Sequence, residues 1–404
     1  MNESLLEKLK SLGFKSGKDV TPPQSKRGVS IQDVIDGHVI QNSLGQFFLH
    51  EREYPENYLH GLEALQQAPA LARISAYFKI PLQKRNKLLF LDTETSGLSG
   101  GTGTLAFLVG LSWWDNNKLS TQQLFLENPA QEPAMLLYLG NIAEQFDSVV
   151  TFNGKSFDIP ILNTRYTLNR MESPFRRMGH IDLLHLSRQL WRERLDDRSL
   201  GSLERAILQF QRTNDDIPGW MVPEMYFEYQ KTEDATKLEG VFYHNEIDVV
   251  SMAALLLRID TLLEQQDDLA NLDNRDIYSL ARIMERLGDP SQALELYRNC
   301  NNVSSFDMQN KILSNSSKLI IRNGQYAEAI EYILNSNMPL DYELARRIAI
   351  LFEHKLMDLT NAKTWALHCM KLIDVTEVRS KAKIEETQRR IERISLKLSR
   401  RQEL

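Results

Sequence analysis

Two carboxylates directly follow an apolar run in the first quarter of this sequence. The segment Leu88–Thr95 reads Leu-Leu-Phe-Leu-Asp-Thr-Glu-Thr, which places Asp92 and Glu94 at its polar end. An unbroken apolar run is typical of a strand buried on both faces, and residues two apart on a strand point to the same side. Two carboxylates on one side repel each other unless a cation lies between them, and Mg2+ is usually held by one or two carboxylates. For this pair alone, the alternative is a turn-capping Asp92 beside a solvated Glu94.

Two later segments carry acidic residues in a comparable setting. The apolar run 148–152 leads into Asn153-Gly-Lys-Ser-Phe-Asp158, and Tyr243-His-Asn-Glu-Ile-Asp248 reads as part of a helix. In this order the three segments resemble the motifs of the RNase H-like, DnaQ-type 3′-5′ exonucleases, whose sites contain four carboxylates. The resemblance covers roughly residues 30–260 and is strongest to the bacterial YprB-type ribonuclease H-like family, which has stretches similar to Asp215–Gly219 and His244–Ser251.

This resemblance implies a metal-dependent nuclease. It assigns Asp92, Glu94, Asp158 and Asp248 as ligands of two Mg2+ or Mn2+ ions. Two such ions clamp the attacking and leaving oxygens of a phosphoryl transfer, and one lowers the pKa of the attacking water. The implied partner is nucleic acid, and the implied activity is 3′-5′ exonuclease action on single-stranded ends. DNA and RNA both remain open because their discrimination depends on contacts to the 2′-hydroxyl.

Two other functions stay open from the sequence. An endonuclease could use the same fold, because end preference depends on how loops block the groove. The chain could also be a repeat-based scaffold or nucleic-acid-binding protein whose nuclease fold is weakly active or inactive. The presence of all four carboxylates and a nearby histidine favours the enzyme.

The candidate general base departs from the family pattern. The two common subclasses place a tyrosine four residues before the last aspartate or a histidine five before it. Here His244 is four residues before Asp248 and Tyr243 is five before it. Residues four apart share a helix face, so we expect His244 beside Asp248 and Tyr243 facing away. Neutral imidazole accepts protons near pH 7, which favours His244 as the base over Tyr243, with a purely structural histidine as a further alternative.

Three basic residues are candidate phosphate contacts. Lys155 lies in the loop before Asp158, Arg165 follows on the next predicted helix, and Arg198 lies in a later turn. Arginine and lysine provide most of the phosphate contacts of nucleic-acid-binding proteins, although exposed basic residues often have no partner.

Other polar and aromatic residues near these motifs have two interpretations each. Asp182 is either a carboxylate that supports the site or a residue that stabilises a helix N-terminus. Trp220 and Tyr226 could stack on an unpaired base, but we predict that both rings pack in the core.

The order of the predicted elements indicates a mixed α/β sheet flanked by helices. Three hairpin-linked strands, 88–95, 105–114 and 119–126, precede a helix over 132–146 and the strand 148–152. We further expect short strands around Gly45, a helix over 59–78 and another helix starting at His180. The predicted RNase H-like domain spans residues 31–265, with 31–82 as its lead-in.

The C-terminal part has a different character. The pattern around Ala293 recurs around Ala329 and, more weakly, around Ala362, at separations of 36 and 33 residues. This resembles tetratricopeptide-like helix pairs, which predicts an all-α repeat domain over residues 266–375 and a possible protein partner. The tail 376–404 is predicted as a basic helix with an apolar stripe; packing on the repeats and contact with nucleic acid are the two alternatives.

Composition limits the remaining possibilities. The 404 residues carry a net charge of −6, so a polyanion must be held by a local basic patch or by bound metal. No stretch approaches the roughly 18 apolar residues of a membrane span. The two cysteines have no zinc-ligand spacing, which predicts a reducing compartment and a cytoplasmic location. Residues 1–30 are predicted to form a polar segment and linker.

Overall fold

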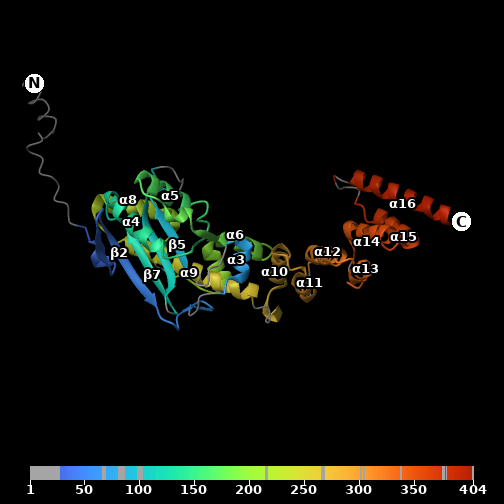
Figure 1. Ribbon diagram of the computed structural model, residues 1–404, viewed down its shortest axis with the longest axis horizontal. Coiled ribbons are helices and arrows are strands. Elements are labelled where there is room, and N and C mark those ends of the chain that lie inside the picture. The colour runs from blue at the N-terminus through green and yellow to red at the C-terminus, as the bar shows by residue number, and fades with distance from the viewer. Residues whose placement is uncertain are drawn as a thin grey trace, which may run out of the picture. The chain divides into compact units, whose positions relative to one another are not determined.

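The computed structural model describes most of the chain after residue 27. The described residues are 28–65, 70–80, 87–97, 103–115, 117–213, 217–264, 269–300, 303, 305–336, 339–374, 378 and 380–402. The predicted N-terminal polar segment therefore lies almost entirely outside them. The described residues form two compact units (Figure 1): the first contains those of 28–70, 80–184 and 199–259, and the second contains those of 71–79, 185–198 and 260–402.

The first unit is built on a seven-stranded mixed sheet. The strand order is β1-β2-β7-β6-β5-β8-β9. Strands β5, β6 and β7 pair antiparallel, as do β1, β2 and β7, whereas β8 and β9 continue the sheet in parallel with β5. The predicted mixed α/β sheet is thus confirmed. The strands are β1 (His38–Asn42), β2 (Gly45–Tyr54), β5 (Leu88–Thr95), β6 (Ala106–Asp115), β7 (Lys118–Phe125), β8 (Ser148–Thr151) and β9 (Gly179–Asp182).

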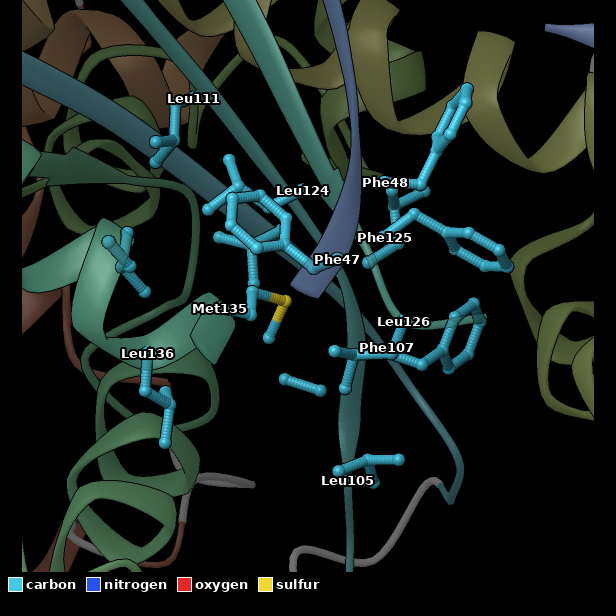
Figure 2. Packing of buried hydrophobic residues seen from close by; sticks show 14 of the residues in the cluster. Phe47, Phe48, Leu105, Phe107, Leu111, Leu124, Phe125, Leu126, Met135 and Leu136 are labelled. Atoms are coloured by element: carbon cyan, nitrogen blue, oxygen red, sulfur yellow. The ribbon is translucent and has the colours of Figure 1, made fainter. Parts of the chain in front are cut away.

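Helices cover both faces of this sheet. On β2, Phe47 and Phe48 point to opposite sides, as Figure 2 shows. The Phe47 ring lies 5.1 Å from Tyr138 on one side, and the Phe48 ring lies 6.3 Å from Phe242 on the other. This two-sided burial explains why β5 begins with four consecutive apolar residues. The helices of this unit are α2 (Ile31–Val34), α4 (Glu132–Ala143), α5 (Asp158–Leu168), α7 (Leu200–Leu203), α8 (Val222–Thr232) and most of α9 (Leu238–Glu264), with short 3-10 turns at 129–131, 174–176 and 219–221 and a π turn at 204–208.

The helix expected over residues 59–78 is wrong for its first half. Strands β3 (Leu59–His60) and β4 (Glu63–Ala64) form a small hairpin there, and among the described residues of this stretch the helix is α3 (Ala72–Phe78). Gly61 has φ +62°, and a Cβ at this position would lie 2.0 Å from the Leu208 carbonyl oxygen. The turn therefore needs glycine, and this tertiary contact overrides the local helical pattern.

The helix expected to start at His180 is also wrong at its beginning. Residues Gly179–Asp182 form β9, which pairs in parallel with β8, and the helix α6 starts at Leu183 and ends at Leu190. A four-residue strand at a sheet edge carries too little periodicity to distinguish it from the helix that follows.

The second unit is helical and contains three consecutive helix pairs. Ala293, Ala329 and Ala362, the residues that defined the predicted repeats, are all fully buried in the second helix of their pair. This arrangement is consistent with helical repeats. The pairs are α10 (Asn274–Leu287) with α11 (Pro290–Asn299), α12 (Phe306–Arg322) with α13 (Tyr326–Leu334), and α14 (Tyr342–His354) with α15 (Leu359–Lys371); α3, α6 and a 3-10 turn at 269–271 complete the unit before α16 (Ser380–Gln402).

The basic helix α16 packs on the last repeat. Ile394 is fully buried, and Ile391 and Leu398 pack against the same cluster. The completely buried Glu353 of α14 receives Arg390 at 3.0 Å, Arg393 at 2.8 Å and Lys397 at 3.2 Å. Burial raises the pKa of Glu353, but hydrogen bonds from Arg393 and Lys397 outweigh it and bring the pKa to about 2. The structure therefore favours the packing interpretation for this helix.

None of the described helices combines the length and the apolar character needed to cross a membrane.

Candidate active site

Strand β5 brings Asp92 and Glu94 to the carboxyl end of the central sheet. Asp92 lies opposite Gly110 of β6, and Asn245 of α9 donates a hydrogen bond to its Oδ2 at 2.9 Å. A Cβ at position 110 would lie 2.3 Å from Asn245 Oδ1. Gly110 thus leaves the space in which Asn245 reaches Asp92, and this face of β5 is directed at α9.

Asp158 reaches the same region from the parallel strand β8. It begins α5, and its Oδ1 accepts hydrogen bonds from the Thr93 backbone N–H at 3.1 Å and from Thr93 Oγ1 at 2.6 Å. Because β5 and β8 run in parallel, their carboxyl ends meet at one edge of the sheet. Thr93, which lies between Asp92 and Glu94 in the sequence, therefore holds Asp158 close to both.

The buried Asp182 positions the loop that leads to Asp158. Its carboxylate accepts hydrogen bonds from the backbone N–H of Asn153 at 2.8 Å and of Lys155 at 3.1 Å. A third comes from the N–H of Leu184 at the start of α6. Asn153 adopts a left-handed conformation with φ +68°, which this bonding stabilises. Asp182 thus both caps a helix and supports the site, which combines the two interpretations open from the sequence.

Helix α9 contributes His244 and Asp248 one turn apart. His244 Nε2 lies 3.7 Å from Asp248 Oδ2, so the two side chains share a helix face. Tyr243 is directed elsewhere, because its hydroxyl accepts a hydrogen bond from the Thr213 backbone N–H at 2.9 Å. This geometry follows the helical spacing, while the identity of the base stays a prediction.

Arg212 joins these side chains and was not found from the sequence. Its guanidinium donates to Asp248 Oδ1, to the buried Glu204 at 2.6 Å and to His244 Nδ1 at 3.1 Å. Only 12% of the Arg212 side chain is exposed. Because Nδ1 of His244 accepts this hydrogen bond, the proton of neutral His244 lies on Nε2. Arg212 lies 36 positions before Asp248, in no recognisable motif, so no sequence signal links the two residues.

Burial raises the pKa of three of these carboxylates. Burial and then the charges of Asp248, Asp158 and Glu94 raise the pKa of Asp92 well above its usual range. Burial raises the pKa of Glu94 to about 7, although His244 and Arg212 lower it. Burial also raises the pKa of Asp158 to about 6, against the hydrogen bonds from Thr93. These buried carboxylates therefore resist being charged at the same time without a cation between them.

The donor set of this cluster fits a hard divalent cation. All four side chains offer carboxylate oxygens, which Mg2+ and Mn2+ prefer, and a cation would relieve the repulsion that helps to raise the pKa of Asp92. In the part of the chain that the structure describes, no three Asp, Glu, His or Cys side chains are yet gathered closely enough to enclose an ion.

Two exposed aromatic side chains lie beside the site residues. Phe157, directly before Asp158, is 50% exposed, and Trp220 is 68% exposed. Gly219, next to Trp220, lies close enough to α9 that a Cβ there would be 3.8 Å from His244 Nε2. The prediction of core packing is therefore wrong for Trp220. It is right for Tyr226, which is buried and stacks on Phe107 at 3.9 Å.

The three predicted phosphate contacts have different surroundings. Lys155 is exposed in the Asp158 loop, where the sequence placed it. Arg165 instead forms a two-point ion pair with the buried Glu132, at 2.5 and 2.7 Å, and only 16% of its side chain is exposed. Arg198 belongs to the second unit. The structure thus supports Lys155 best as a contact for substrate at this site.

Comparison with known proteins covers this whole region. The model of the RNase H superfamily matches residues 89–259, a range that contains every site residue of the first unit described above. The uncharacterized protein YprB of Bacillus subtilis (strain 168) is 30% identical over 326 residues, which are 78% of this chain and 78% of YprB.

Proposed function

The chain belongs to the RNase H superfamily, in the family of YprB, and from this premise we propose that it is a divalent-metal-dependent 3′-5′ exonuclease. The superfamily domain is a nuclease fold, and it suggests nucleic acid as the binding partner. One observation carries the proposal: carboxylates from β5, α5 and α9 gather at the end of the central strand, where burial raises the pKa of Asp92, Glu94 and Asp158. Such clusters of perturbed carboxylates are typical of catalytic sites.

The proposed metal ligands are Asp92, Glu94, Asp158 and Asp248. Enzymes of this fold generally use divalent ions, which here would neutralise the substrate phosphate and acidify the attacking water. Asn245 and Thr93 hold Asp92 and Asp158 in place for this task. Buried hydrogen bonds of this kind fix the orientation of ligands and tune their affinity for metal.

His244 is the proposed general base. To accept a proton from water at Nε2, neutral His244 must carry its own proton on Nδ1, which now accepts from Arg212. Arg212 therefore has to release His244 before the reaction. A substrate phosphate is a suitable new partner for Arg212, because guanidinium groups bind phosphate oxygens in the same planar geometry as carboxylates.

The exposed residues around the cluster suit an unpaired strand end. Lys155 offers an ammonium group for phosphate, and Phe157 and Trp220 offer exposed rings on which bases can stack. A base can stack on a protein ring only when it is not already paired and stacked within a duplex, so these rings favour single-stranded substrate.

End-labelled single-stranded DNA and RNA test the proposal. Strands labelled at the 5′ or the 3′ end are incubated with Mg2+, Mn2+ or EDTA, beside the variant Asp92→Ala as control. A metal-dependent ladder from the 5′-labelled strand, absent in Asp92→Ala, is the expected result and identifies the preferred nucleic acid. Internal cuts would instead show an endonuclease. No cleavage by a protein that binds Mn2+ would favour the scaffold function.

A further inference from the structure

The second unit contains a large cavity of about 1080 Å³ that the proposed nuclease site does not use. Its walls come from residues 185–198, which include most of α6, and from α10, α12 and the start of α14. Helices α10, α12 and α14 are the first helices of the three pairs. Stacked helix pairs commonly form extended concave binding surfaces of this kind.

Three of the four walls carry cations that face the cavity. Arg188 and Arg192 are four residues apart along residues 185–198, and Arg282 and Arg286 are four apart on α10. On α12, Lys311 and Lys318 are seven apart. On α10 and α12 these spacings place the two cations on one helix face, while Arg188 near the end of α6 and Arg192 just beyond it line the same space. In all, seven Arg or Lys and four Asp or Glu side chains line the cavity.

The four carboxylates of the lining already have partners. Lys311 binds Glu193 at 3.1 Å and Asp307 at 2.8 Å. Asp341 caps α14 by accepting from the Leu344 N–H, and Glu343 lies 4.0 Å from Arg346 outside the cavity. These contacts leave little negative charge to balance the other cations.

Five cations of the lining have no carboxylate within ion-pair distance among the described residues: Arg188, Arg192, Arg198, Arg286 and Lys318. All of them except Arg198 are exposed. Partial burial and then the charges of Arg347 and Arg282 lower the pKa of Lys318. The cavity therefore carries an excess of positive charge, in a chain whose net charge is −6.

The other lining groups also match phosphate and sugar oxygens. Gln189, Asn310, Ser314 and Asn315 add amide and hydroxyl donors between the cations. Such side chains, with arginine and lysine, make most contacts to nucleic-acid backbones. The lining offers no exposed apolar anchor of the kind a bound peptide needs, since Ile283 is its one aliphatic side chain and is buried.

We infer that this cavity binds the phosphodiester backbone of single-stranded nucleic acid. The inference rests on the proposed function only for the choice of partner, because a nuclease needs to hold the strand that it shortens. Arg198, expected from the sequence to contact substrate, lines this cavity and is assigned to it. A second site on the same chain raises the local concentration of a strand end. It should lower KM for long strands and leave kcat unchanged.

Binding is tested on the full chain with Asp92→Ala as the background, so that no cleavage occurs. The probe is a fluorescent 30-nucleotide single strand, and anisotropy is measured over a range of salt concentrations. The triple variant Arg188→Glu, Arg282→Glu and Lys318→Glu places one reversal on each of the three basic walls. It is expected to bind at least tenfold more weakly, with a salt slope smaller by about 2, since each lost contact removes about 0.7 from the slope for a single strand.

A matched triple variant controls for net charge. Lys371→Glu, Lys381→Glu and Arg400→Glu reverse three exposed cations of the same unit that do not line the cavity. The affinity of this control for the strand is expected to lie within twofold of that of the Asp92→Ala parent. The melting temperatures of both triple variants should match that of the parent. Equal loss in both variants, or no loss in the cavity variant, overturns the inference.

Two further outcomes separate this site from the proposed catalytic function. If the parent does not bind the strand while the wild-type chain degrades it, the cavity inference fails and the nuclease proposal stands. If the Asp92→Ala parent binds through the cavity but the wild-type chain degrades no strand, the cavity inference stands and the nuclease proposal fails. Binding of poly-glutamate but not of the oligonucleotide would also overturn the inference, by showing that the cavity recognises an acidic protein.

Discussion

Arg212 contacts three residues of the candidate site. It neutralises the buried Glu204, and it holds Asp248 and His244, the proposed metal ligand and the proposed base. A cation in this place stabilises the cluster of carboxylates in the absence of metal. The same contact competes with metal for Asp248.

Replacing Arg212 should therefore change stability and metal binding in opposite directions. Arg212→Gln leaves Glu204 buried without its partner, which is expected to cost about 3 kcal/mol of unfolding free energy. Its affinity for Mn2+ should increase, because Asp248 becomes available. Thermal unfolding and Mn2+ titration measure the two effects. The double variant Glu204→Gln with Arg212→Gln is expected to recover most of the stability; unchanged Mn2+ affinity in both variants would contradict this role.

His244 and Tyr243 can be separated by their variants. His244→Ala is expected to lower kcat by about 10²–10⁴-fold, the usual contribution of a general base, while Mn2+ binding persists. Tyr243→Phe removes only the hydroxyl that accepts from Thr213 and should retain most activity. Turnover on a labelled single strand measures both. A fully active His244→Ala beside an inactive Tyr243→Phe would assign the base to Tyr243.

The raised pKa values predict how stability depends on pH without metal. Glu94, with a pKa of about 7 when folded and 4.5 as its ordinary value, binds its proton more tightly in the folded chain. The stability gained from that proton is complete below pH 4.5 and is lost as the pH rises through 7. In EDTA, Glu94→Gln is therefore expected to gain stability relative to wild type as the pH rises from 5 to 8. Thermal unfolding at several pH values measures this difference.

Divalent ions should remove this pH dependence. A cation between the carboxylates stabilises their charged forms, so Mg2+ or Mn2+ is expected to raise the melting temperature of the wild-type chain most at pH 7–8. Glu94→Gln should respond less to the ions. Equal pH profiles for wild type and Glu94→Gln in EDTA would show that Glu94 has an ordinary pKa in the folded protein.

At the scale of elements, the central strands were predictable and their short neighbours were not. Both faces of the sheet are covered, so β5 begins with the unbroken apolar run 88–91. Such a run is a strong local signal for a buried strand, and it predicted β5. Strands β3 and β9 depend on partners far along the chain, so their sequences alone resemble helix or loop. The site residues follow the same division. The carboxylates were identified because they lie in short local motifs, whereas the role of Arg212 and the exposure of Trp220 depend on the tertiary structure.

The turns inside the helix pairs share one backbone feature. Gly288, Gly324 and Met357 each lie two residues before the second helix of a pair, with φ of +83°, +78° and +57°. Glycine adopts this conformation without strain, whereas methionine does not. This position explains part of the weaker sequence similarity of the third pair.

Met357→Gly should therefore stabilise the repeats. The Met357 side chain is exposed, so its removal loses little packing, and the relief of strain is expected to contribute about 1 kcal/mol. Leu356→Gly, at a neighbouring position without positive φ, should destabilise and serves as the control. Thermal unfolding compares them; a lower melting temperature for Met357→Gly would contradict the strain.

At the scale of the whole molecule, the two units do not correspond to two continuous halves of the sequence. Residues 71–79 and 185–198 pack with the C-terminal helices, although the sequence pattern places a boundary near residue 265. Arg286 lies over the Tyr77 ring at 4.4 Å, and Arg194 binds Asp276 at 2.8 Å. Sequence periodicity detects the repeats, but it does not show that segments from earlier in the chain pack with them.

A chain ending at Glu264 is therefore expected to expose apolar side chains and to aggregate. It retains α3 and residues 185–198 but lacks the helices that cover the buried Ile74 and Trp191. We expect it to bind a hydrophobic dye and to aggregate on size-exclusion chromatography, in contrast to the full chain. A monomeric truncated chain without dye binding would show that these segments do not need the repeats.

The same interleaving affects synthesis on the ribosome. Helix α3 ends at Phe78, and its partner α10 begins only at Asn274, 196 positions later. At roughly 5–20 residues per second, α3 waits about 10–40 s for that partner to be made. During this interval the apolar side of α3, with Ile74 and Tyr77, is available to chaperones that bind nascent chains. Completion of translation, and not only folding of the nuclease unit, therefore determines when this protein can reach its final structure.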